Sequence, residues 1–230
     1  MYRACGSRST GPETGVPKSL LFTSSGPSEG KSISSIAIAR DFASLGLKVL
    51  LVDCDLRDPS LHKKLKTENA IGLGSYLTGA CSPPQAFQAT DLATLTLMNS
   101  GPLPPNAADL LSSARLISLL TVGREVFDFV VLDGPPVMGL ADAPLLGSAA
   151  SATVFIVGAG QARASLMRGA LRRLAMARAT VIGSVVTKFD ARSYGYGYAY
   201  AYGYGADKAY GPAVGSDPDK PRLNRTRDAA

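Results

Sequence analysis

The clearest chemical signal in the sequence is the loop 24–32, which reads Ser-Ser-Gly-Pro-Ser-Glu-Gly-Lys-Ser. It lies between an apolar run, 20–22, and a segment with helical character, 33–45. A loop between a strand and a helix presents backbone N–H groups and the positive helix end to an anion. Within it, Lys31 can reach the β- and γ-phosphates of a nucleotide, and Ser32 places a hydroxyl where such loops hold Mg²⁺. We therefore predict a nucleotide-binding loop made of Gly26, Pro27, Ser28, Glu29, Gly30, Lys31, Ser32 and Ile33.

One position of this loop departs from the pattern Gly-x-x-x-x-Gly-Lys-Ser/Thr, because Ser25 stands where the pattern has glycine. The alternative interpretation is a Gly- and Ser-rich turn that only caps the following helix. The apolar strand before the loop and the helix after it favour nucleotide binding over that alternative.

Acidic residues end two further apolar runs. Asp53 and Asp55 follow Leu-Leu-Val, and Asp133 follows Val-Val-Leu. An aspartate at the end of an apolar strand is the Walker B pattern, in which the carboxylate holds Mg²⁺ or its water. We predict that Asp53 and Asp133 serve the metal ion with Ser32, and that Asp55 accepts a proton from a hydroxyl substrate. Each acid taken singly also fits a helix cap or a turn, and the reverse assignment of Asp53 and Asp55 stays open.

The elements that must position these side chains alternate between strands and helices. Apolar runs rich in Val, Ile and Leu predict strands at 19–25, 48–53, 95–98, 128–133, 153–157 and 180–187. Helical patterns lie between them at 32–45, 107–122 and 164–177. This alternation predicts an α/β fold, a doubly wound parallel sheet like that of P-loop NTPases, with strands buried on both faces. In such a sheet a ligand lies beyond the carboxyl ends of the strands, where the loop and the acids are.

The composition fits one domain. With 230 residues, of which 46% are hydrophobic, the chain can form one substantial core, which we place at 19–190. The net charge of +6 fits a solvated basic face, or attraction to an anionic membrane or an acidic partner. Nucleic acid is not an expected partner, because the core has no strand motif that combines aromatic and basic residues.

The cysteines and the hydropathy point to the cytoplasm. Cys5, Cys54 and Cys81 are odd in number and lack metal-site spacing, as expected for reduced cysteines. The N-terminus lacks the apolar core of a signal peptide, and no apolar run approaches the roughly 18 residues of a membrane span. Any connection to a membrane is therefore expected to come through a partner.

The two ends of the chain differ from the core. Residues 1–18 are polar and rich in Gly, Ser, Thr and Pro, so we expect a flexible lead-in. Residues 191–230 are expected to be disordered, because the tyrosines in this tail alternate with Gly or Ala and leave little to bury. The tail is either a low-complexity linker or a row of hydroxyl substrates for phosphoryl transfer. Its candidate phosphoacceptors are Tyr194, Tyr196, Tyr198, Tyr200, Tyr202, Tyr204 and Tyr210.

Taken together, these motifs resemble the bacterial tyrosine kinases of capsular and exopolysaccharide biosynthesis, a family of deviant-Walker P-loop ATPases. The resemblance covers residues 18–190 and the tyrosine tail. It rests on the loop 25–32, the paired-acid segment 52–62, the segments 104–106 and 109–113, Asp133-Gly134-Pro135-Pro136 and, above all, the tyrosine cluster.

The resemblance implies an ATP- and Mg²⁺-dependent kinase whose neighbouring subunits phosphorylate one another's tails. It also implies a membrane activator that regulates polysaccharide chain length, an opposing tyrosine phosphatase, and a role in polymer polymerisation and export. The kinase is then cytoplasmic and is recruited to the inner face of the plasma membrane through its partner.

Several positions depart from the family pattern. Ser28 replaces a glycine common in the family's loops, and Thr187 stands near the place where related ATPases have a base-contacting asparagine. Arg3 lacks the preceding Glu of the family's assembly motif, so ring formation by that motif is not expected. One alternative function is a partitioning or positioning ATPase, but Gly26 stands where those proteins carry a signature lysine. Another is a catalytically weak scaffold whose tail binds partners.

Overall fold

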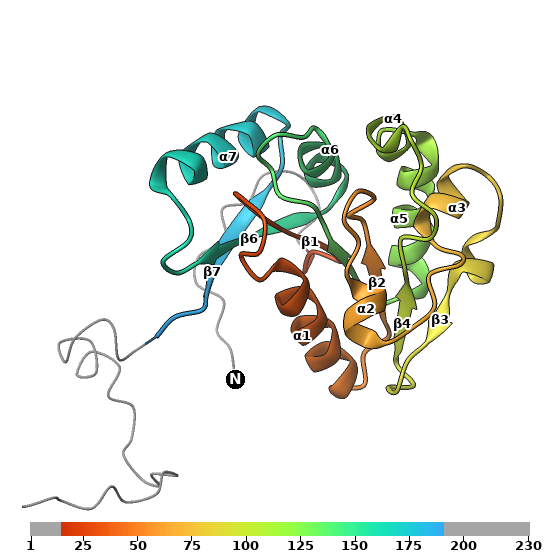
Figure 1. The fold of residues 1–230 in the computed structure, drawn as a ribbon. Helices are drawn as coiled ribbons and strands as arrows, with labels where there is room; N and C mark the ends of the chain where they lie inside the picture. Colours follow the sequence, from red (N-terminus) through yellow and green to blue (C-terminus); the bar gives the residue numbers. More distant parts are fainter. Residues whose placement is uncertain (1–14, 191–230) are drawn as a thin grey trace, which may run out of the picture. The chain divides into compact units, whose positions relative to one another are not determined.

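A computed structural model describes residues 15–190 and shows a seven-stranded sheet with helices on both faces (Figure 1). The strand order is β3-β4-β2-β5-β1-β6-β7, and every neighbouring pair is parallel except the antiparallel pair β3 and β4. The strands are β1 (Ser19–Ser24), β2 (Val49–Asp53), β3 (Gln88–Ala89), β4 (Leu95–Met98), β5 (Phe129–Asp133), β6 (Ala152–Gly158) and β7 (Val181–Thr187). The predicted doubly wound α/β fold is confirmed.

Two helical layers cover the sheet because side chains alternate along each strand. In β2, Leu51 packs with α1 on one face, whereas Leu50 packs with α5 on the other. A smaller cluster joins Phe155 of β6 to α6 and α7. The helices are α1 (Lys31–Ser44), α2 (Leu61–Leu65), α3 (Leu73–Leu77), the 3₁₀ helix η1 (Pro83–Ala86), α4 (Ala107–Leu111), α5 (Ala114–Val126), α6 (Asp142–Ala149) and α7 (Ala164–Met176). No helix within residues 15–190 combines the length and apolar character that crossing a membrane requires.

The structure corrects three details of the sequence-based assignment. The predicted helix 107–122 is two helices, α4 and α5, because the backbone at Ser113 is extended (φ −74°, ψ 156°). The short elements β3, α2 and α3 were not predicted, since two to five residues carry too little periodicity to identify them. Strand β7 is not buried on both faces as expected, because among residues 15–190 it is the last strand of the sheet and most of its residues are exposed.

The predicted lead-in 1–18 lies mostly outside the described residues. The tyrosine tail 191–230 lies wholly outside them, and so do all of its candidate phosphoacceptors. The domain boundaries at both ends therefore stay predictions.

Candidate active site

The loop between β1 and α1 turns through two left-handed backbone positions. Gly30, just before α1, has φ 98°, and an added Cβ would lie 3.1 Å from the Thr187 side chain. Ser28 has φ 59°, which is a left-handed backbone conformation. This conformation is unfavourable for residues that have a Cβ atom, whereas glycine adopts it without steric strain. The family's glycine at position 28 thus matches the backbone found here, and the serine adopts that conformation nonetheless.

Glu29 holds this loop together from the inside. Its carboxylate accepts hydrogen bonds from the Ser25 hydroxyl (2.5 Å) and the Gly26 amide (2.5 Å), and also from the amide of Gly158 at the end of β6 (3.1 Å). Glu29 itself is only 3% exposed. Ser25, the residue that departs from the P-loop pattern, is therefore a donor that fixes the loop, and its φ does not require glycine.

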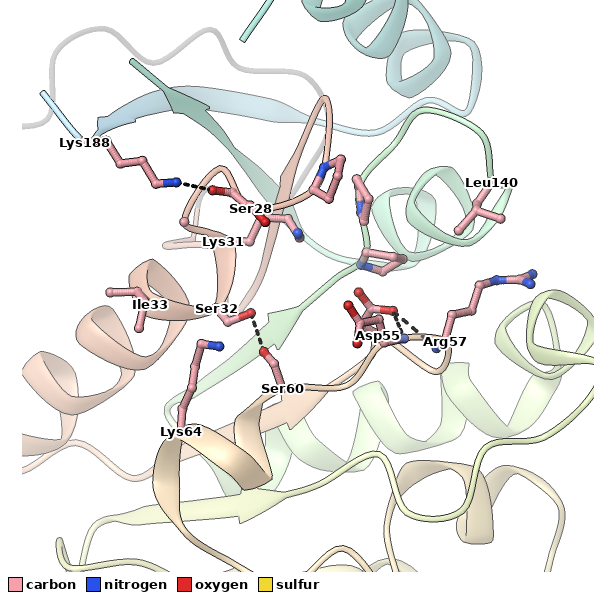
Figure 2. Close-up of a pocket in the computed structure, with 15 residues that line it drawn as sticks. Ser28, Lys31, Ser32, Ile33, Asp55, Arg57, Ser60, Lys64, Leu140 and Lys188 are labelled. Carbon is pink, nitrogen blue, oxygen red and sulfur yellow. Dashed lines mark hydrogen bonds between the residues drawn. The ribbon is translucent and has the colours of Figure 1, made fainter. Parts of the chain in front are cut away.

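The end of β7 supports the same loop from the other side. The Thr187 hydroxyl donates to the Glu29 carbonyl (2.6 Å), and the Lys188 ammonium donates to the Ser28 carbonyl (2.6 Å) and to Gln161 (2.8 Å). Figure 2 shows Lys188 beside the loop. Lys188 was not among the site residues predicted from the sequence, although its place directly after the carboxyl end of a strand is a usable signal.

The loop forms one wall of an open pocket of about 430 Å³ (Figure 2). The opposite wall comes from the segments that follow β2 and β5. Four cationic side chains face two acids in the lining, a balance that suits a phosphorylated ligand. The lining residues are Pro27, Ser28, Gly30, Lys31, Ser32, Ile33, Asp55, Arg57, Asp58, Ser60, Lys64, Pro135, Pro136, Leu140 and Lys188.

The predicted nucleotide-binding residues divide into two groups. Six of them line the pocket, namely Pro27, Ser28, Gly30, Lys31, Ser32 and Ile33. Gly26 and Glu29 are not part of the lining, and they support the loop through their mutual hydrogen bond instead. Sequence reasoning missed Ser60, whose hydroxyl donates to the Ser32 hydroxyl (2.9 Å), and it missed Lys64 on α2.

Asp53 and Asp133 lie side by side beneath the pocket, because β2 and β5 are adjacent and pair these two residues. Asp53 accepts three backbone N–H bonds, from Asp55 (3.2 Å), Ser60 (3.1 Å) and Leu61 (3.0 Å), and so holds the start of α2. Burial, with a further contribution from the charge of Asp133, raises the pKa of Asp53 to about 7. Burial likewise raises the pKa of Asp133 to about 6, against the opposing effects of Ser32 and Lys31.

Asp133 carries the feature that fits a metal ion. Its Oδ1 atom is buried, and no hydrogen-bond partner for it is found among residues 15–190. A buried carboxylate oxygen left unpaired is costly, so a cation or its water is the expected partner. The part of the chain that the structure describes holds no cluster of three His, Cys, Asp or Glu side chains that could bind a metal alone. This donor set suits Mg²⁺, which proteins bind through one or two carboxylates together with substrate phosphates.

Asp55 differs from the two buried acids because it lines the pocket. Its Oδ1 accepts the backbone N–H groups of Arg57 (3.3 Å) and Asp58 (3.0 Å), and burial raises the pKa of its carboxyl group. The side chain of Arg57 forms an ion pair with the buried Asp142 carboxylate (2.7 Å). The Asp142 side chain binds Arg57 and forms no capping hydrogen bond at the start of α6.

The structure thus brings the predicted catalytic set together at one edge of the sheet. Lys31 lies on the loop after β1, Asp53 and Asp55 follow β2, and Asp133 ends β5. The positive charge of Lys31 lowers the pKa of both Asp55 and Asp133, as expected for groups within electrostatic reach of one another. The catalytic and metal-binding roles of these residues stay predictions, whereas their common location is observed.

Comparisons with known proteins agree with this geometry. The CobQ/CobB/MinD/ParA nucleotide binding domain family matches residues 20–198. Tyrosine-protein kinase YwqD of Bacillus subtilis is 38% identical over 169 residues, which cover 74% of this chain and 71% of YwqD. The kinase domain of Escherichia coli tyrosine kinase ETK superimposes with a TM-score of 0.75 at 26% identity, covering 84% of this chain and 73% of that chain. The chimerical protein CapA2B2 gives 0.72 at 28% identity, with 75% and 76% covered.

The matched family covers more than half of the chain, and the identity to YwqD extends over most of both proteins. The nucleotide-binding fold expected from loop 24–32 is therefore confirmed, and so is the resemblance drawn from the paired acids and the tyrosines. This chain belongs to the CobQ/CobB/MinD/ParA nucleotide-binding domain family and, within it, to the bacterial tyrosine-protein kinases.

Proposed function

We propose that this protein is an ATP- and Mg²⁺-dependent kinase that phosphorylates the tyrosines of its own C-terminal tail. The observation that carries the proposal is the single pocket in which a phosphate-binding loop faces Asp55, with Asp133 directly beneath. A nucleotide switch needs the loop and the metal site, but it does not need a row of tyrosines after the domain.

The chemistry follows from the positions of the side chains. The tyrosine oxygen forms a bond to the γ-phosphorus of ATP, the bond from that phosphorus to the β–γ bridging oxygen breaks, and ADP leaves. The phenolic proton passes to the carboxylate of Asp55, whose pKa is raised by burial and so lies closer to that of the tyrosine, about 10. Lys31 places a positive charge against the phosphate oxygens on which negative charge develops.

Ser32 and Asp133 are the residues that would hold Mg²⁺, with Asp53 acting directly or through water. When bound, the ion neutralises charge on the phosphate oxygens. The backbone N–H bonds to both oxygens of Asp53 favour the indirect role for that residue. Ser60, through its bond to the Ser32 hydroxyl, helps to orient the serine.

The proposed phosphoacceptors are Tyr194, Tyr196, Tyr198, Tyr200, Tyr202, Tyr204 and Tyr210. A neighbouring subunit presents them, and a tyrosine phosphatase reverses the modification. Recruitment to the inner face of the plasma membrane comes through a membrane activator that regulates polysaccharide chain length and export. A solved relative that is a chimerical protein, CapA2B2, supports a kinase domain that works with a second polypeptide.

The central experiment measures phosphotyrosine on the purified protein after ATP and Mg²⁺ are added. Transfer between subunits is tested by mixing two variants, Lys31→Met with an intact tail and a second chain whose seven tail tyrosines are Phe. Phosphorylation of the Lys31→Met chain only in the mixture is the expected result. ATP hydrolysis without any phosphotyrosine would instead support a nucleotide switch, and the absence of both activities would support a scaffold.

Recruitment is tested separately by adding vesicles that contain the candidate membrane protein. We expect its cytoplasmic segment to raise the phosphorylation rate and to bring the kinase to the vesicles. Full activity of the isolated chain, together with no association with membranes in its own cells, would remove the activator from the proposal.

A further inference from the structure

The two ends of the pocket differ in charge. Figure 2 shows Lys64 and Lys188 at one end of the pocket and Arg57 and Leu140 at the other. Neither of these two lysines forms an ion pair with an acid within residues 15–190, and the same is true of Lys31. The charges of the three lysines can therefore act on the phosphate oxygens of a nucleotide.

Arg57 differs from the lysines because a buried carboxylate pairs with its charge. Its Nε atom donates to Oδ2 of Asp142 (2.7 Å) and its Nη2 atom donates to Oδ1 (3.3 Å). These two bonds fix the plane of the guanidinium group, while 44% of the Arg57 side chain stays exposed. Asp55 and Asp58, which lie two residues before Arg57 and one residue after it, add two acids to the lining. Because these carboxylates repel phosphate oxygens, the Arg57 end of the pocket suits an uncharged group.

The uncharged group that fits this end is an aromatic ring. Pro135, Pro136 and Leu140, which all lie between β5 and α6, give the pocket an apolar surface opposite the phosphate-binding loop. Apolar side chains pack against the faces of aromatic rings, and the plane of a guanidinium group stacks on them. Arg57 can offer such a plane although its charge is already paired.

Hydrogen bonds to the backbone hold the apolar surface in place. The Thr23 hydroxyl in β1 donates to the Pro135 carbonyl (2.7 Å), and Arg173 in α7 donates to the Leu140 carbonyl (2.8 Å). The surface is thus anchored to a central strand and to a helix. A surface that is already fixed can orient a substrate without a further loss of conformational freedom.

We propose that the end of the pocket built from Arg57, Pro135, Pro136 and Leu140 binds the aromatic ring of the tyrosine that receives the phosphate. We call this end the ring site, and the inference rests on the proposed function. In Figure 2, Asp55 lies between the ring site and the lysines. A ring held there can direct its hydroxyl group toward Asp55 and the γ-phosphate. Serine and threonine have no ring to make these contacts, so the ring site selects tyrosine.

The test uses a synthetic peptide with the sequence of residues 194–204. The protein is the full-length chain with its seven tail tyrosines changed to Ser, so that its own tail offers no ring. Peptide affinity is measured with a non-hydrolysable ATP analogue bound, and KM is measured from initial rates of phosphotyrosine formation with ATP and Mg²⁺. A second peptide with Phe in place of Tyr should compete for binding, whereas a third peptide with Ser should not.

Variants of the two ends should separate peptide binding from nucleotide binding. Leu140→Ser should weaken peptide binding and raise the KM for the peptide by about tenfold, while the affinity for ATP changes less than about twofold. Leu140→Met should restore most of the peptide affinity. The matched control Leu166→Ser changes a leucine that is 40% exposed and lies outside the pocket, so it should alter neither affinity.

Two further variants test the contrast in charge. Arg57→Lys keeps the positive charge but removes the guanidinium plane, so it should raise the KM for the peptide several-fold. Lys64→Met should lower the affinity for ATP and leave peptide affinity at saturating analogue unchanged. A loss of peptide affinity in Lys64→Met as large as that in Leu140→Ser would contradict the division of the pocket into two ends.

Unchanged peptide affinity in Leu140→Ser would overturn the proposal, and so would the absence of peptide binding to the parent chain. Equal losses of ATP and peptide affinity in Leu140→Ser would also overturn it, because they would indicate a change in the whole pocket. Competition by the Ser peptide equal to that by the Phe peptide would show that the ring is not recognised. If the parent chain binds the peptide but transfers no phosphate to it, the proposed function fails, and the binding measurements alone decide whether the ring site exists.

Discussion

Strands β2 and β7 have similar apolar sequences but opposite surroundings. All five residues of β2 are buried, whereas six of the seven residues of β7 are exposed. The cause is position, since β2 lies between β4 and β5 inside the sheet, whereas β7 is the last strand in the part of the chain that the structure describes. The central strands build the catalytic edge of the sheet because their ends are rigid and protected from water, which strengthens the interactions of the charges placed there. The edge strand leaves surface available for binding.

The largest expected effect is the loss of kinase activity when Lys31 of the phosphate-binding loop is replaced. Lys31→Met should reduce tail phosphorylation by about 100- to 1,000-fold or more, because it removes a charge directed at the phosphate oxygens of the transition state. The measurement is the initial rate of phosphotyrosine formation at saturating ATP. The matched control, Lys48→Met, changes an exposed lysine outside the pocket and should leave the rate unchanged. Equal rates in wild type and Lys31→Met would remove Lys31 from the catalytic set.

The second prediction compares the two strands by truncation. Leu51→Ala in β2 should lower the free energy of unfolding by about 2–5 kcal/mol, because Leu51 is fully buried and the change leaves a cavity. Val185→Ala in β7 should cost less than about 0.5 kcal/mol, as is usual for exposed positions. Urea denaturation of both variants gives the two values. A cost for Val185→Ala close to that for Leu51→Ala would mean that β7 is covered in solution.

The third prediction is that the buried carboxyl groups of Asp53 and Asp133 make the stability of the protein depend on pH. Asp53 and Asp133 have pKa values raised from 3.8 to about 7 and about 6, so the folded chain holds their protons more tightly than the unfolded chain. Their contribution to stability is therefore present at pH values below 3.8 and is lost as the pH rises through about 6 and 7. In Asp133→Asn the loss of unfolding free energy between low and high pH should be smaller than in wild type by up to about 3 kcal/mol.

This difference is measured as the free energy of unfolding of both proteins, without nucleotide, from pH 4 to pH 8. Adding Mg²⁺ and ATP at pH 8 should stabilise wild type and fail to stabilise Asp133→Asn. The control Asp91→Asn changes an exposed carboxylate whose pKa is lowered by its hydrogen bond with Arg40, so it should not reproduce the effect. A wild-type protein whose stability rises steadily across this range would contradict the prediction.

The smallest effect concerns the backbone of the loop. Ser28→Gly should stabilise the protein by no more than about 1 kcal/mol, because relief of the left-handed conformation is partly offset by the greater freedom of glycine in the unfolded chain. Gly30→Ala should have the opposite effect, since it adds a Cβ at φ 98° against the Thr187 side chain. The temperature of thermal unfolding and the affinity for ATP should both be lower in Gly30→Ala than in wild type. A more stable Gly30→Ala would show that the loop is not held as described.

Much of the fold and of the site could be predicted from local patterns. Loop 24–32 and the strand-ending acids Asp53, Asp55 and Asp133 were recognisable because each motif depends on residues adjacent in the chain. Six predicted strands are present, because apolar runs of four to seven residues between turn signals are strong local evidence of a strand. The tail tyrosines were also recognisable by their spacing, and their role as phosphoacceptors stays a prediction.

Contacts between distant segments could not be predicted in this way. Lys188 and Thr187 contact the loop across about 160 residues of sequence, and Arg57 pairs with Asp142 across 85. Neither contact leaves a local signal, because any lysine or aspartate at a strand end has many possible partners. The role of Glu29 could not be predicted either. Its place in the loop motif predicted contact with the nucleotide, whereas its carboxylate accepts hydrogen bonds from Ser25, Gly26 and Gly158 inside the protein.

The sequence by itself determined the chemistry of this protein, since the types and spacing of its loop residues, acids and tyrosines define a nucleotide-binding tyrosine kinase. Only the tertiary structure decided which strand is central and which is at the edge, because strand order depends on how helices pack over the whole sheet and is not encoded in any one strand. That order puts Asp53 beside Asp133 and raises their pKa values. It also leaves the apolar side chains of β7 exposed, although they resemble those that form the core.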